Sequence, residues 1–395
     1  MSSGPILNVI YTNIGRGHPF YLDGIIHILS TNYKDRIKLN IHDVFSLSSG
    51  LSLRLWKLVR YMYRKGSQGG VVGRVYEQLR RGGKTDSYGL IEKQLARGIR
   101  SFLKDNPYPT LVAHPVLVPM ISDLVPVFYQ HGEIAVPPQA AVTKAKRVYV
   151  PLNESRDIML SFGCPQSKMC VTGLCVESDL AIDSTTMFEK RLHRIENKDF
   201  LVGGLFSSGA EPVGHVEKIV AAARSLSSAG HGAVIFCKAG GILEHALIDF
   251  PGISRFKPED RKISFKDAIR KNHILVTLFS GRKQEHDAAI RLFKYLDFVI
   301  SPSHERSHWA AGLGVPFFIL HPIIGPFSPL NREFLMKLGV ALDISDISGA
   351  NDFGVLLNEL ISAGKLTEMA QNGFNKFDVN GFSFITSDIV DQLTG

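Results

Sequence analysis

The chain has 395 residues, 45% hydrophobic and 21% charged, which excludes a largely disordered protein. This length exceeds what one hydrophobic core usually spans and predicts two domains. The net charge of +8 is local: residues 54–104 hold thirteen Lys and Arg against three Asp and Glu, so the remainder carries −2. A local anionic partner is therefore favoured over general nucleic-acid binding.

The four cysteines form no CxxC pair and no spacing typical of a zinc site, so we expect reduced thiols, a cytoplasmic protein and no metal. The first ten residues lack the basic and apolar regions of a signal peptide. The most apolar stretch, residues 111–129, is interrupted by His114, Asp123 and three prolines. A transmembrane helix needs about 20 mostly apolar residues, so none is predicted.

The first half of the chain begins with an apolar strand over residues 5–11, a glycine-bearing turn and a helix with apolar residues at helical spacing. Further short strands are predicted over residues 37–41, 111–113, 125–129, 147–150 and 169–171. Short apolar strands separated by helical segments predict a parallel sheet with crossover helices.

The same opening recurs at residues 200–209, where a strand meets glycines and serines before a second helix. More strands are predicted over residues 233–237, 274–278, 298–300 and 315–320. The repetition predicts an α/β protein with two Rossmann-like domains facing each other across a cleft. We place the domains at residues 1–176 and 177–375, and a final helix, which can pack back on the first domain, at 376–395.

The turn of the first domain reads Gly15-Arg16-Gly17-His18. Its glycines allow a ligand close to the backbone, and the following helix N-terminus favours negative charge. A dinucleotide fingerprint needs a third glycine where Phe20 stands, which disfavours a nicotinamide cofactor. His18 is expected at the carboxyl end of the first strand, where an imidazole can take a proton from a hydroxyl. A histidine that only stabilises the turn is the alternative.

Two segments of the second domain suit phosphate. Gly204, Ser207 and Ser208 precede a helix, as in many phosphate sites, although an ordinary strand–helix turn has the same composition. Ser303 is expected to be a helix N-cap, with Arg306 and two histidines adding to an anion site. A solvated helix start is the alternative there.

A basic helical stripe over the insertion at about residues 50–104 comprises Arg54, Lys57, Arg60 and Arg64. An apolar stripe of leucines and Met62 runs beside it, with aromatic residues between. This pattern is typical of a helix that lies on an anionic membrane surface. An ordinary surface helix with a solvated basic face fits the same pattern.

In their order and spacing these motifs resemble the monogalactosyldiacylglycerol synthase and diacylglycerol glucosyltransferase group of the glycosyltransferase-B superfamily. More distantly they resemble the lipid-linked N-acetylglucosamine transferase of peptidoglycan synthesis. The segments that carry the resemblance are residues 15–18, 113–117, 171–176, 201–204 and 312–316, with Asn331. They stand where the family has its GxGH loop, HPL segment, interdomain link and donor-site flanks.

The resemblance implies an inverting glycosyltransferase, independent of metal and cofactor, that moves sugar from a nucleotide-diphosphate sugar, usually a UDP-sugar, to a lipid or other hydrophobic hydroxyl. It gives His18 the role of catalytic base and places Glu133 near a cleft-facing family aspartate. Gly15, Gly17 and His114 would form the acceptor loop. The donor site would comprise Gly204, Ser207, Ser208, Ser303, His304, Arg306, Ser307, Trp309 and Asn331. The protein would be peripheral on the inner face of a membrane.

Trp309 stands where the family helix usually carries the glutamate that holds the ribose hydroxyls. We expect its indole to stack on a base or sugar, with His304, Arg306 and His308 on the phosphates. Alternatively the ring turns inward and fills the ribose site. A catalytically lapsed sugar-nucleotide-binding protein, a nucleotide-sugar epimerase and, more distantly, a nicotinamide oxidoreductase are the alternative functions.

Overall fold

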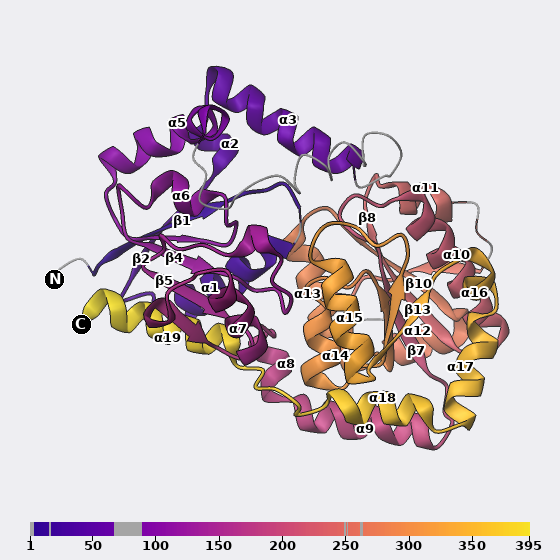
Figure 1. Ribbon diagram of the computed structural model, residues 1–395. Coiled ribbons are helices and arrows are strands. Elements are labelled where there is room, and N and C mark those ends of the chain that lie inside the picture. The colour runs from indigo at the N-terminus through magenta and orange to yellow at the C-terminus, as the bar shows by residue number, and fades with distance from the viewer. Residues whose placement is uncertain (1–3, 16, 67–88, 249, 251, 261–263) are drawn as a thin grey trace. The chain divides into compact units, whose positions relative to one another are not determined.

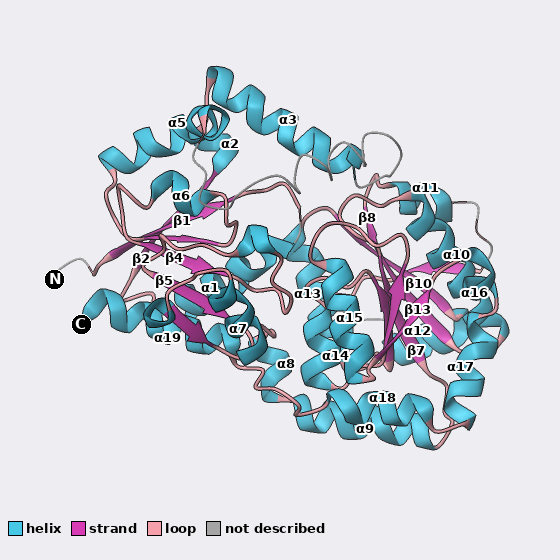
Figure 2. Cartoon of the chain, in the orientation of Figure 1, coloured by secondary structure: helices cyan, strands magenta, loops and turns pink. Residues whose placement is uncertain are grey.

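The structure is a computed structural model that describes residues 4–15, 17–66, 89–248, 250, 252–260 and 264–395. It divides into two compact units, the first formed by Met1–Ser178 with Asp378–Gly395 and the second by Asp179–Phe377. Each unit contains its own parallel sheet and its own helices (Figures 1 and 2). The predicted α/β class with two parallel sheets is confirmed.

The sheet of the first unit has the strand order β2-β1-β3-β4-β5-β6, with every neighbouring pair parallel. Its strands are β1 (Ile6–Tyr11), β2 (Lys38–Asp43), β3 (Thr110–Val112), β4 (Val127–Gln130), β5 (Arg147–Val150) and β6 (Met169–Val171). The chain adds β2 on one side of β1 and β3 on the other. The carboxyl ends of β1 and β3 therefore flank a topological switch point, where open α/β sheets bind ligands.

The helices of the first unit are α1 (Gly17–Asn32), α2 (Val44–Leu47), α3 (Gly50–Gly66), α5 (Leu90–Asp105), α6 (Leu117–Ile121), α7 (Asn153–Ser161) and α19 (Gly381–Thr394). Two short 3₁₀ turns cover Pro138–Ala140 and Gln166–Lys168. Helix α1 follows the spacing of its apolar residues: Leu22, Ile25 and Leu29 are buried on one face. Each such side chain contributes roughly 1.5–3 kcal/mol when fully buried.

Helix α19, the last of the chain, packs on α1 in the core of the first unit. The Phe382 ring lies so close to Gly24 of α1 that a Cβ there would be 2.4 Å from it. Asp388 accepts hydrogen bonds from Arg147 (2.6 Å) and from the hydroxyl of Tyr149 (2.8 Å). Burial and the nearby Asp388 carboxylate raise the pKa of Tyr149. The C-terminal segment is thus held by both packing and charge.

The second unit has the strand order β13-β12-β11-β7-β8-β10-β9, again parallel throughout. Its strands are β7 (Val202–Phe206), β8 (Gly232–Lys238), β9 (Ile253–Arg255), β10 (Ile274–Phe279), β11 (Phe298–Ser301), β12 (Phe317–Leu320) and β13 (Ala341–Ile344). The chain places β8, β9 and β10 on one side of β7, with β10 between the other two, and places β11, β12 and β13 on the other side. The switch point of this sheet therefore lies at the carboxyl ends of β7 and β11.

Helices cover both faces of the second sheet: Figure 1 shows α13, α14 and α15 on one face and α10 and α16 on the other. The helices are α8 (Ser178–Ile182) at the junction of the units, α9 (Ser184–Glu196), α10 (Val213–Ser228), α11 (Ile242–Leu247), α12 (Phe265–Asn272), α13 (Arg282–Phe293), α14 (Ser307–Leu313), α15 (Ser328–Leu338), α16 (Ile347–Asn351), α17 (Phe353–Ser362) and α18 (Lys365–Gly373). Coverage of both faces explains why the central strands are apolar throughout.

Candidate functional site

Gly15 and Gly17, in the turn between β1 and α1, are required because polar side chains pack closely against them. A Cβ at Gly17 would lie 3.0 Å from Oε1 of Glu133, and a Cβ at Gly15 would lie 2.9 Å from the hydroxyl of Tyr63 on α3. Any larger residue at Gly15 or Gly17 would push these polar side chains away. The two glycines therefore let a carboxylate and a phenol approach the backbone that leads to His18.

His18, His114 and Glu133 follow three neighbouring strands, β1, β3 and β4, and the fold brings them to one edge of the sheet. The rings of His18 and His114 are 4.6 Å apart between centroids and inclined by 53°. Nδ1 of His114 accepts a hydrogen bond from the amide of Val116 (3.3 Å), so the neutral ring carries its proton on Nε2. The switch point thus holds two imidazoles and a buried carboxylate, groups that can accept and donate protons.

A hydrogen-bonded chain holds the segment that carries Glu133. Nε2 of His131 donates to the carbonyl of Ala135 (3.0 Å), which leaves Nδ1 to accept from the hydroxyl of Tyr129 (3.3 Å). Burial, with a further contribution from the nearby Glu133 charge, raises the pKa of Tyr129, so its phenol stays protonated as a donor. The ring of Tyr21 fills the space beside Gly132, where a Cβ would be 2.2 Å away.

Gly204 does not form a phosphate loop, contrary to our expectation. It lies inside β7, paired with Val299 and Val234, so its backbone belongs to the sheet. A Cβ at Gly204 would be 2.7 Å from Leu296, and one at Gly203 would be 2.4 Å from Phe298. These glycines are explained by side chains that pack against the strand.

Ser303 is not a helix N-cap, because α14 begins at Ser307 and Arg306 occupies the N-cap position. The hydroxyl of Ser303 is buried and bonds the carbonyl (2.9 Å) and the hydroxyl (2.7 Å) of Ser328. Asn331, also buried, donates its side-chain amide to the carbonyl of Ser303 (3.0 Å). Ser303 and Asn331 thus fasten the loop after β11 to the start of α15.

Arg306 is held in an internal ion cluster, also contrary to our expectation. Its guanidinium pairs with Glu305 (2.9 Å) and with Glu285 of α13 (3.1 Å), and all three residues are buried. It also lies 3.8 Å from the centroid of the Phe206 ring. Two carboxylates already compensate its charge, so Arg306 anchors α13 to the loop after β11 and brings no net positive charge to a diphosphate.

Trp309 points into the interior, so the expected stacking surface is not formed. Its side chain is 2% exposed and packs edge-on against Phe206 (6.0 Å between centroids) and Phe293 (5.0 Å). His308, the next residue towards the helix start, is also buried. The inward orientation that we considered as the alternative is the one observed.

Basic groups that the sequence analysis missed gather at the carboxyl ends of β7 and β12. His215 on α10 is fully buried, and its Nε2 bonds the carbonyl of Pro322 (2.8 Å). Nζ of Lys218, one turn further on, donates to the carbonyl of His321 (2.9 Å). Burial, with smaller contributions from His304, Lys218 and His321, lowers the pKa of His215 to about 4. The sequence contains two signals for this group: the spacing of His215 and Lys218 after the serine loop, and the position of His321 directly after a strand.

Three serine hydroxyls lie near the switch point of the second sheet, at the carboxyl ends of β7 and β11. Ser207 and Ser208 directly follow β7, and Ser307 begins α14. Within the described part of the chain, the buried Oγ atoms of Ser208 and Ser307 have no hydrogen-bond partner. Buried hydroxyls of this kind are rare in folded proteins, and an absent ligand or water is one explanation for them.

Helix α3 presents a mixed basic and apolar surface. Trp56 and Ser52 bury its inner face through hydrogen bonds to the carbonyl of Leu95 (both 3.0 Å). The outer face exposes Leu51, Arg54, Lys57, Leu58, Tyr61 and Lys65. Arg60 departs from the predicted stripe, because its guanidinium covers the Phe45 ring at 4.2 Å. The side chain of Arg64, and residues 67–88 of the predicted insertion, lie outside the described residues. None of the described helices is long and apolar enough to cross a bilayer.

No protein-family profile and no curated protein matches the sequence, whereas solved structures match nearly the whole chain. One is UDP-GlcNAc 2-epimerase from Neisseria meningitidis bound to UDP-GlcNAc, with a TM-score of 0.58 and 14% identity over 98% of this chain and 100% of that one. The S. aureus MnaA–UDP structure has a TM-score of 0.56 and 10% identity over 98% and 97%. Phytolacca americana UGT2, complexed with UDP-2fluoro-glucose and pterostilbene, has a TM-score of 0.54 and 12% identity over 99% and 100%.

Structural matches over nearly the whole chain at these TM-scores show the fold, whereas identities this low leave the activity to be argued from the site. The two parallel sheets, each with a switch point, agree with these matches along the whole chain. The chain therefore has the glycosyltransferase-B type of fold, with two Rossmann-like domains, that glycosyltransferases and UDP-GlcNAc 2-epimerases share.

Proposed function

We propose that the protein is an inverting glycosyltransferase that moves a sugar from a nucleotide-diphosphate sugar, a UDP-sugar by preference, to a hydroxyl of a lipid or other hydrophobic acceptor. The observation that carries the proposal is the grouping of His18, His114 and Glu133 at the switch point of the first sheet. The neighbours of known structure that hold UDP or UDP-sugars support the choice of donor. The motif resemblance to glycolipid-forming enzymes supports the choice of acceptor.

In this proposal the first unit activates the acceptor. His18 takes the proton of the acceptor hydroxyl, and the oxygen forms a bond to the anomeric carbon as the bond from that carbon to the diphosphate breaks. The configuration inverts, and the diphosphate leaves with the bonding electron pair. His114, in ring contact with His18, orients the base, and Glu133 favours the imidazolium that forms. No metal or cofactor is needed, because the leaving group is stabilised by protein groups.

The second unit holds the donor in this proposal. The hydroxyls of Ser207, Ser208 and Ser307 face the diphosphate, and Lys218 and His304 supply positive charge. This assignment moves the phosphate contacts away from Gly204, Ser303 and Arg306, which serve packing or internal pairing. Charged groups at a sheet switch point suit a leaving group whose charge grows in the transition state.

A second candidate function is a nucleotide-sugar epimerase. It is favoured by the match of the whole chain to UDP-GlcNAc 2-epimerase, and by a buried carboxylate, Glu133, among groups that exchange protons. A lapsed sugar-nucleotide-binding protein is a third candidate, favoured by Trp309 in the interior and Arg306 in an ion cluster. These candidates differ in what becomes of the sugar.

The test is turnover by the full-length protein with a panel of UDP-sugars and vesicles that contain diacylglycerol, followed by NMR of the sugar. We expect a glycolipid and free UDP. A His18→Ala variant should lose about 10²–10⁴-fold in turnover, the usual contribution of a general base. His27→Ala, an exposed histidine of the same helix, is the matched control. Interconverted UDP-sugar without transfer would replace the proposal by the epimerase, and binding without any product by the lapsed protein.

A further inference from the structure

A pocket of about 510 Å³ lies at the amino ends of the strands in the second unit. Val202 opens β7 and lines it, and Asp297, which directly precedes β11, lines it as well. The serine loop follows Phe206 at the other end of β7, about 13 Å away at the usual rise per residue of a strand. The pocket is therefore distinct from the proposed donor site of the same unit.

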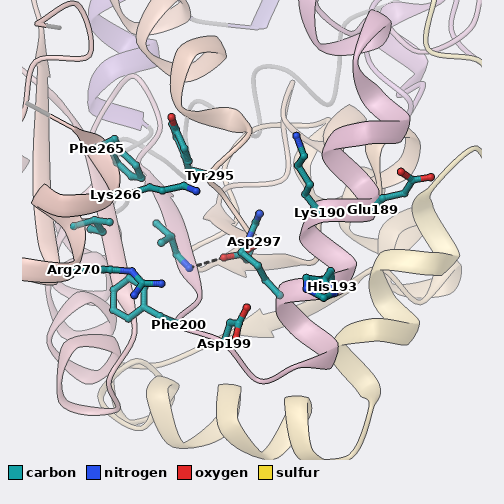
Figure 3. Close-up of a pocket in the computed structure, with 13 residues that line it drawn as sticks. Glu189, Lys190, His193, Asp199, Phe200, Phe265, Lys266, Arg270, Tyr295 and Asp297 are labelled. Atoms are coloured by element: carbon teal, nitrogen blue, oxygen red, sulfur yellow. Dashed lines mark hydrogen bonds and ion pairs between the residues drawn. The ribbon is translucent and has the colours of Figure 1, made fainter.

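The floor of the pocket is an ionic group. Figure 3 shows Asp297 at its centre, between residues of α9 on one side and residues of α12 on the other. Asp297 is fully buried and accepts hydrogen bonds from Nε of Arg194 (2.7 Å) and from the amide of Val202 (2.8 Å). Burial raises the pKa of Asp297 despite its two arginine neighbours. Its two oxygen atoms are both used within the protein.

A second arginine of α9 lies behind the floor and is not among the residues that line the pocket. Arg191, one turn before Arg194, is also buried and donates to the carbonyls of Leu296 (3.1 Å) and Leu313 (2.9 Å). Burial lowers the pKa of Arg191 to about 10, which still leaves it charged at neutral pH. Arg194 thus pairs directly with the Asp297 carboxylate, and Arg191 adds a second positive charge nearby. Among the described residues that line the pocket, Arg194 has a buried Nη2 atom with no hydrogen-bond partner.

An unpartnered buried guanidinium nitrogen is costly, so the Nη2 atom of Arg194 points to an acceptor that is absent from the protein itself. The rim adds Lys190, Lys266 and Arg270, all exposed. Glu189 and Asp199 also line the pocket. Counting Arg194 and Asp297, four basic side chains face three acidic ones, an excess suited to a single anionic group and not to a chain of phosphates.

The walls are apolar and aromatic. Phe200, Phe265, Ile269 and Tyr295 line the pocket, and the rings of Phe265 and Tyr295 stack with centroids 4.6 Å apart. A volume of this size suits a small organic ligand, and aromatic walls favour a flat ring. We propose that this pocket binds a small molecule that carries one anionic group, a phosphate or carboxylate, on an apolar ring.

The test is titration of the full-length protein with phenyl phosphate, followed by two-dimensional NMR of backbone amides. We expect shifts at the pocket residues, with inorganic phosphate, which lacks the ring, and benzyl alcohol, which lacks the charge, each binding at least fivefold more weakly. A double variant, Lys266→Gln with Arg270→Gln, should weaken phenyl phosphate at least fivefold. Both side chains are exposed, so the fold should be kept, which the melting temperature checks.

The matched control is Lys271→Gln with Lys283→Gln, two exposed basic residues of the same unit that do not line the pocket. It should bind phenyl phosphate as the wild type does. Three results would overturn the proposal: shifts confined to the surroundings of Ser207 and Ser307, unchanged affinity in the rim variant, or equal affinity for inorganic phosphate. No shift anywhere at millimolar phenyl phosphate would overturn it as well.

Discussion

Trp309 packs in the interior at the position where the family that the sequence resembles carries a ribose-binding glutamate. Its indole is 2% exposed between Phe206 and Phe293. We expect Trp309→Ala to lower the free energy of unfolding by about 3–5 kcal/mol, the usual cost of removing a large buried ring. Chemical denaturation measures this effect.

Trp309→Phe is the companion variant, because it retains most of the buried ring and should recover most of the stability. Nucleotide affinity, measured by calorimetry on the folded fraction of each variant, should stay near that of the wild type. An alanine variant of normal stability that fails to bind nucleotide would instead make the indole a ligand platform.

His215 makes the stability of the second unit depend on pH. In the unfolded chain its imidazole gains a proton as the pH falls through its ordinary value of 6.5, whereas in the fold it stays neutral down to about 4. The unfolded state is therefore favoured increasingly over this range, and the free energy of unfolding should fall as the pH is lowered from about 6.5 to 4. The full effect amounts to about 3 kcal/mol.

Denaturation at several pH values measures this slope. His215→Gln, whose amide can still donate to the carbonyl of Pro322, should flatten it, because the titrating group is gone. His245→Gln, an exposed histidine of the same unit, is the control and should leave the slope unchanged. Identical slopes for wild type and His215→Gln would contradict the assignment.

At the scale of elements, helix α3 has one face that packs against the protein and another that is exposed to solvent. The buried Trp56 fixes its rotation, so Arg54 and Lys57 are exposed next to Leu58 and Tyr61, which are 51% and 58% exposed. Each basic residue near an anionic surface contributes about 1 kcal/mol. Arg54→Glu with Lys57→Glu should therefore weaken binding to anionic vesicles by about 30-fold or more.

Vesicle sedimentation at several salt concentrations measures this, and wild-type binding should weaken with salt. The control is Lys34→Glu with Lys38→Glu, two exposed lysines of the first unit outside α3. Arg60→Glu should have a smaller effect on binding than Arg54→Glu, since Arg60 covers Phe45. Equal sedimentation of the wild type with neutral and anionic vesicles would refute a membrane role for α3.

At the scale of the whole molecule, the chain passes between its two units twice, at residues 178–179 and 377–378. A ligand that binds only the folded state of one unit raises the free energy of unfolding of that unit. UDP at one hundred times its dissociation constant should raise the free energy of unfolding by about 2.7 kcal/mol. A thermal-shift titration measures this, with uridine, which lacks the diphosphate, as the matched control. A shift with NAD and none with UDP would favour the nicotinamide alternative.

The sequence was sufficient to predict the α/β class and the two parallel sheets. Two strand–glycine–helix openings, at residues 5–18 and 200–213, predict two parallel sheets because only parallel strands need a helix after each strand. The contact between His18 and His114 also follows from their positions in the sequence, because residues that follow neighbouring parallel strands lie at the same end of the sheet. Periodicity and the positions of strand ends are local properties, and a sequence displays them directly.

Only the tertiary structure reveals the environments of the candidate site residues in the second unit. Gly204 is small because Leu296 packs against it, and Arg306 is neutralised by Glu285, 21 residues earlier in the chain. The environment of His215 depends on Pro322, more than a hundred residues later. Burial and pairing depend on such distant partners, which no spacing along the chain encodes. For the same reason the pocket around Asp297 could be recognised only in the folded chain, where four separate segments come together.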